Sequence, residues 1–158
     1  SGYSGAGKNL KKKFSHKNLY SSTFAYGIKG HRHICELDQQ LYKHTKKKVF
    51  YSPGLVSIEE HLFEPMKESD LLLVDGTFWT DTEMIDNGLS KKLAREMGHN
   101  PQSGHGGMIE ELNKIDGPKK ILIHINNSNP ILNEKSNERK ILSDNNIDVS
   151  FDGMEISL

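Results

Sequence analysis

The sequence predicts an α/β fold in which a parallel sheet is covered by helices. Residues 71–74 and 120–125 are short, nearly unbroken apolar runs, as expected of strands buried on both faces. Segments with the apolar spacing of helices separate them, and regular alternation of this kind is typical of α/β proteins. We therefore expect these two strands to be adjacent and parallel.

The first elements expected along the chain lie between residues 49 and 75. Residues 49–52 form a short strand, and Pro53-Gly54 makes a turn. Ser57 with Glu60 has the spacing of a capping box that opens a helix. The apolar face of this helix is formed by Ile58, Leu62 and Met66.

The second half continues the alternation. Thr80 with Glu83 has the spacing of a second capping box, and a helical stripe continues to Gly98, which can end the helix. The stripe is formed by Leu89, Leu93 and Met97. The remaining expected elements are helices over 108–115 and 136–143, a turn over 116–118, and strands over 120–125, 149–151 and 154–156.

Composition bounds the class of protein. With 34% hydrophobic residues and a mean hydropathy of -0.64, the 158 residues are lean for a self-sufficient core. No apolar run reaches 18 residues and no apolar leader is visible, so we expect neither a membrane span nor a signal peptide. The single cysteine, Cys35, excludes a disulfide framework and makes a cytoplasmic protein the expectation.

Charge divides the chain into two pieces. Residues 1–48 carry 11 basic and two acidic residues, whereas residues 49–158 carry 10 basic and 19 acidic residues. Such asymmetry is typical of a basic tail or of two unrelated pieces. We expect a basic, poorly packed fragment over residues 1–45 and a separate unit over 46–158.

The basic piece contains two motif-like segments. Its first eight residues have phosphate-loop spacing, but Asn9 replaces the hydroxyl residue that would hold magnesium. His31, His33 and Cys35 alternate as zinc ligands can, without a fourth ligand. Together with Ser1–Lys8 and Glu36, the His-Arg-His segment resembles N-acetyl-γ-glutamyl-phosphate reductases over about residues 1–41. The resemblance implies His31 as acid/base and His33 with Glu36 as substrate contacts, but that family's cysteine nucleophile and nucleotide-binding domain are absent.

Three side chains form the main candidate site. Asp75 follows the strand at 71–74, His124 lies at the end of the strand at 120–125, and His99 follows Gly98 at a similar junction. The carboxyl ends of parallel strands meet at one edge of a sheet, so we expect these groups to converge. Asp75 as a helix cap and His99 as an ordinary loop residue are the structural alternatives.

The second piece carries a longer resemblance. Phe50-Tyr51-Ser52-Pro53-Gly54, Val74-Asp75-Gly76-Thr77-Phe78-Trp79, Arg95-Glu96-Met97-Gly98-His99 and His124-Ile125-Asn126-Asn127-Ser128-Asn129-Pro130 stand in this order. Over about residues 46–158 they resemble the PqqB family of pyrroloquinoline quinone (PQQ) biosynthesis, within the metallo-β-lactamase superfamily. The resemblance implies the C-terminal half of a four-layer αββα sandwich.

The resemblance also implies a divalent metal, iron or zinc. It makes His124 the metal-binding histidine and Asp75 and His99 catalytic residues of the same cleft. The superfamily's main metal motif would lie before residue 46 and is missing. Pro53-Gly54 stands where many relatives have a metal-bridging aspartate, so the site in this chain is expected to be incomplete.

The function implied is a step in PQQ biosynthesis, either metal-dependent oxidation of the tyrosine-bearing precursor or handling and transport of PQQ. A reductase fragment and a nonfunctional fusion are the alternatives. The expected partners are the peptide-derived precursor or PQQ itself, without nucleic acid or membrane, and a homo-oligomer is a further expectation. Because the site lacks half its ligands, the truncated chain alone is expected to bind metal weakly and to turn over nothing.

Overall fold

The computed structural model describes residues 46–158. The expectations for residues 1–45, among them His31, His33 and Glu36, lie outside this part of the chain. The described elements are β1 (Val49–Ser52), α2 (Glu60–Lys67), β2 (Leu71–Asp75), α3 (Glu83–Asp86), α4 (Met108–Leu112), β3 (Lys119–Ile123), α5 (Asn137–Asp144) and β4 (Ile147–Val149), with 3₁₀ turns at Arg95–Met97 and Pro130–Leu132. Strands and helices alternate, as the α/β prediction requires.

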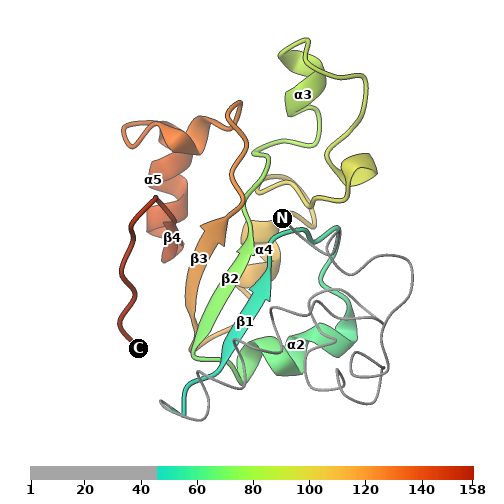
Figure 1. Ribbon diagram of the computed structural model, residues 1–158. Coiled ribbons are helices and arrows are strands. Elements are labelled where there is room, and N and C mark those ends of the chain that lie inside the picture. Colours follow the sequence, from blue (N-terminus) through green and yellow to red (C-terminus); the bar gives the residue numbers. More distant parts are fainter. Residues whose placement is uncertain (1–45) are drawn as a thin grey trace, which may run out of the picture.

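The four strands form one parallel sheet in the order β1-β2-β3-β4. Leu71 pairs with Val49 on one side and with Lys119 on the other, so the two apolar runs are adjacent and parallel as predicted. The arrows of β1, β2 and β3 point toward the same end in Figure 1. The long segment that carries α3 extends beyond that end.

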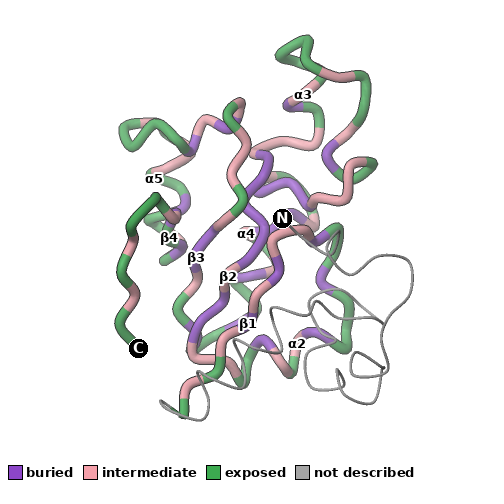
Figure 2. The backbone as a smooth tube through the Cα atoms, in the orientation of Figure 1, coloured by how far each residue is buried: buried purple, intermediate pink, exposed green. Residues whose placement is uncertain are grey.

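One face of the sheet carries the main core cluster. Strand residues in two register rows share this face, with Leu72 opposite Phe50 and Val74 opposite Leu122. They form one buried cluster with Met66 of α2 and with residues of α4 and α5. In Figure 2, much of the tube coloured as buried lies in the strands, whereas the turn after α3 is coloured as exposed. The predicted placement of helices over the sheet is confirmed.

The two predicted capping boxes are wrong. Glu59 and Thr82 precede α2 and α3, and neither makes a side-chain cap. The Glu83 carboxylate instead accepts a hydrogen bond from the Trp79 backbone N–H, at 2.5 Å, and so closes the preceding turn. The expected stripe to Met97 is also wrong, because Leu89 is 62% exposed.

The ends of the later elements follow local signals more closely. Gly98 ends the short 3₁₀ turn with a φ of +94°, as predicted. Ser136 caps α5 by accepting a hydrogen bond from the Arg139 N–H. Residues 154–156 form no strand, because the chain turns at Gly153, which has a φ of +84°. Among the described helices, none is long and apolar enough to cross a membrane.

Candidate metal centre

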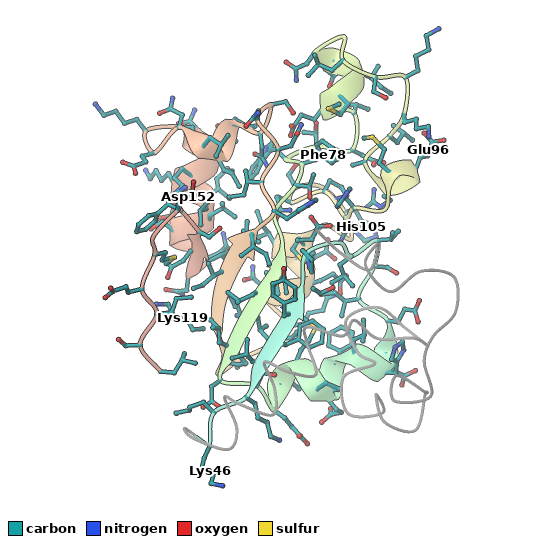
Figure 3. All side chains as sticks on the ribbon, viewed as in Figure 1. Lys46, Phe78, Glu96, His105, Lys119 and Asp152 are labelled. Atoms are coloured by element: carbon teal, nitrogen blue, oxygen red, sulfur yellow. The ribbon has the colours of Figure 1, made fainter. Side chains whose placement is uncertain are left out.

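The candidate site lies at the carboxyl edge of the sheet. Asp75 is the last residue of β2 and pairs in register with Ile123, the last residue of β3, so His124 follows directly beside it. His99 approaches from the segment beyond α3 and packs its ring edge-to-face on Phe78, with 5.6 Å between ring centroids. Figure 3 places Phe78 beyond this edge and Lys46 at the opposite end of the sheet. The three predicted residues are therefore brought together.

Asp75 is completely buried and accepts four hydrogen bonds. Its Oδ2 accepts from the Leu55 N–H at 2.9 Å and lies 2.8 Å from His99 Nδ1. Its Oδ1 accepts from the Thr77 N–H at 3.0 Å and from the Thr77 hydroxyl at 2.6 Å. A carboxylate has about four lone-pair positions, so this group is fully used by the protein. Asp75 thereby contacts Leu55, Thr77 and His99.

The two histidines lie side by side. Their rings are stacked, with centroids 5.3 Å apart and planes inclined by 23°. The His99 side chain is 16% exposed, and His124 is exposed. One ligand atom from each of Asp75, His99 and His124 lies within 4.8 Å of the others. Imidazole nitrogens and a carboxylate are the donors that zinc and iron accept.

Close contact between β2 and β3 sets the position of His124. The Gly76 N–H donates to Ile123 O at 2.7 Å, and a Cβ at Gly76 would lie 2.8 Å from Leu122 Cβ and 2.9 Å from Ile123 O. Only glycine fits here without displacement. His124 then adopts a φ of +58°, a conformation that is uncommon outside glycine and occurs at functional sites.

His99 is held by polar contacts of its neighbour Asn100. The Asn100 N–H donates to Leu55 O at 2.6 Å, and the Leu55 N–H in turn donates to Asp75. Leu55 therefore connects the segment that carries His99 to the end of β2. Arg95 links Asp81 to Asn100, with distances of 3.2 Å and 3.1 Å. These contacts fix the part of the long segment that lies next to His99.

Thr77 is a residue of the site that the sequence pattern did not predict. Its Oγ1 lies 3.0 Å from His99 Nδ1 and 2.9 Å from His124 Nδ1, in addition to its contact with Asp75. The signal available in the sequence was the two-residue spacing from Asp75, which is typical of an aspartate that bonds the backbone N–H of a turn. That spacing predicts the turn but not the histidine contacts.

Comparison with known proteins gives two domain matches. The β-lactamase superfamily domain matches residues 41–125, and the dimerisation domain of semialdehyde dehydrogenases matches residues 1–63. The first match covers more than half of the chain and includes Asp75, His99 and His124. The second agrees with the reductase-like resemblance of the N-terminal piece.

Two similar proteins carry the same name. Coenzyme PQQ synthesis protein B of Methylobacillus flagellatus is 58% identical over 112 residues, which are 71% of this chain and 37% of that protein. The protein of the same name from Nitrosococcus oceani is 56% identical over 114 residues, which are 72% of this chain and 37% of that protein. The chain thus spans less than two fifths of the length of these relatives.

A solved structure agrees with the sequence matches. The Zn²⁺-bound PqqB of Methylobacterium extorquens superposes with a TM-score of 0.70 at 35% identity, over 72% of this chain and 41% of that one. The fold and the sequence thus identify the same group of proteins. The chain belongs to the β-lactamase superfamily.

Proposed function

We propose that this chain acts in PQQ biosynthesis as the part of a PqqB-like protein that contributes His99 and His124 to a divalent metal site. The observation that carries the proposal is the convergence of both imidazoles on the buried Asp75 at the carboxyl edge of the sheet. The 58% identity to a PQQ synthesis protein supports the pathway. The zinc in the similar PqqB structure supports the class of cofactor.

The donor set fits such a metal in a particular way. Because four protein donors already occupy Asp75, we assign it as a positioning residue, whereas His99 Nε2 and His124 Nε2 are the ligand atoms. A carboxylate that holds the other nitrogen of a metal-bound histidine is a recurrent arrangement. Two imidazoles leave a four-coordinate site two ligands short, so further ligands or water complete it.

The arrangement favours chemistry over simple carriage of PQQ. A bound divalent metal would supply Lewis acidity or, as iron, redox chemistry toward the tyrosine-derived precursor. The protein's own part is to hold both rings in fixed orientation, with Phe78 shielding one edge of His99. The two oriented ring nitrogens that can hold such a metal are what supports the catalytic alternative.

The test is calorimetric titration of the full chain with zinc and with ferrous iron. We expect one weak site, with at least about tenfold weaker binding in His99→Ala and in His124→Ala. His61→Ala and His105→Ala are matched controls, because their side chains are 58% and 100% exposed and neither belongs to the cluster. Equal binding by all four variants would contradict the proposed site, and PQQ binding without any metal binding would favour the carrier.

A further inference from the structure

We infer that the Thr77 hydroxyl is the positioning group that fixes the proton of His124 on Nδ1 and leaves its Nε2 free to bind a metal. The inference rests on the proposed metal site and adds a residue to it. Thr77 is nearly buried, with 5% of its surface exposed, and lies between the strand ends that carry Asp75 and His124. Its hydroxyl has one proton and two lone pairs for its polar neighbours.

The position of the hydroxyl proton follows from its shortest contact. Thr77 Oγ1 lies 2.6 Å from Asp75 Oδ1, and an ionised carboxylate can only accept. Two oxygens at this distance need a proton between them, so the hydroxyl donates to Asp75. The longer contact of Oγ1 with the His124 carbonyl, at 3.0 Å, is then left without that proton.

The lone pairs of the hydroxyl are consequently free to accept. His124 Nδ1 lies 2.9 Å away, and Thr77 Oγ1 is its hydrogen-bond partner among the described residues. A contact between this nitrogen and an oxygen that has already donated its proton requires an N–H on the ring. The proton of neutral His124 therefore sits on Nδ1, and Nε2 keeps its lone pair.

His99 reaches the same state by a different route. Its Nδ1 lies 2.8 Å from Asp75 Oδ2 and 3.0 Å from Thr77 Oγ1, so the carboxylate is the closer acceptor. Removing the Thr77 hydroxyl leaves His99 with Asp75 but leaves His124 with no side-chain acceptor for Nδ1 among residues 46–158. The two histidines should therefore respond differently to one substitution.

Thr77 also holds the turn that carries His124. Its carbonyl accepts from the Asn126 N–H at 3.1 Å and from Asn129 Nδ2 at 3.2 Å. These bonds involve the backbone of Thr77 and are retained when only the side chain changes. Thr77→Val therefore removes the hydroxyl with little change of shape, and Thr77→Ser restores it.

The experiment is two-bond ¹H–¹⁵N correlation NMR of the histidine rings in the metal-free full chain at neutral pH. We expect protonated Nδ1 on His99 and His124 in the wild type. In Thr77→Val, His124 should lose this pattern while His99 keeps it, and Thr77→Ser should restore His124. The exposed His61 and His105 give reference signals in the same spectrum.

Zinc titration of the same samples supplies the second readout. We expect Thr77→Val to weaken binding by about 10- to 100-fold, the usual effect of losing a group that orients a ligand. Protonated Nε2 on His124 in the wild type, or an unchanged His124 pattern in Thr77→Val, would overturn the inference. Absence of zinc binding by the wild type would contradict the proposed function instead, because the NMR measurement is made without metal.

Discussion

Gly76→Ala tests whether the close contact between β2 and β3 builds the site. The new Cβ would lie 2.8 Å from Leu122 Cβ, 2.9 Å from Ile123 O and 3.3 Å from Ile125 Cγ1. Real Cβ atoms do not approach backbone atoms this closely, so the strand ends must separate. Overpacking of this kind costs about 1–3 kcal/mol in the free energy of unfolding. Since Gly76 lies between Asp75 and Thr77, the separation should also part Thr77 from His124.

The matched control is Gly54→Ala. A Cβ at Gly54 would meet His99 Cε1 at 3.8 Å and Gly98 O at 4.0 Å, which are ordinary contacts. Urea denaturation of both variants measures the difference, and ring NMR reports the contact of His124. A Gly76→Ala protein within about 0.5 kcal/mol of the wild type, with an unchanged His124 signal, would refute the reasoning.

Four further substitutions test the fold. Asn129→Ala should lower the free energy of unfolding by about 1–3 kcal/mol. The reason is that the buried Asn129 Nδ2 donates hydrogen bonds to the carbonyls of Gly76 and Thr77. An unchanged urea midpoint would contradict this prediction. Leu72→Ala should lower the free energy of unfolding by about 2–5 kcal/mol, and Leu73→Ala should lower it less. Leu72 is fully buried in the core cluster, whereas Leu73 is half-buried on the other face of the sheet. Equal losses in the two variants would contradict this placement of the core. The Lys48 N–H and the Lys47 ammonium hold the pKa of Asp70 below its ordinary value. The stabilisation of the folded state by this carboxylate is therefore complete above about pH 4 and is lost as the pH falls further. Asp70→Asn should flatten this part of the pH dependence of the free energy of unfolding, and a profile identical to that of the wild type would contradict the prediction.

The parts of the fold that could be predicted are those fixed by burial. The run from Leu71 to Val74 and the run ending at Ile123 have few alternatives to central parallel strands, and their adjacency brings Asp75 and His124 to one edge. The helix expected up to Met97 failed because apolar spacing alone does not bury a segment. Leu89 has that spacing and is exposed.

The polar contacts of the site could not be predicted in the same way. Thr77 contacts His99 and His124 across 22 and 47 residues of chain. Such contacts depend on ångström-scale placement of strand ends, which a sequence pattern does not specify. The saturation of Asp75 by four donors likewise appears only in three dimensions, and it is the reason why we propose a positioning role for this residue in place of the catalytic role that the resemblance implies.

The most direct test of the central claim is a crystal structure of the full chain soaked in zinc, with anomalous data collected at the zinc edge. We expect one peak about 2.0–2.1 Å from both His99 Nε2 and His124 Nε2, with Asp75 still bonded to His99 Nδ1 and Thr77. A peak bound to the Asp75 carboxylate, or one that avoids either histidine, would contradict the central claim.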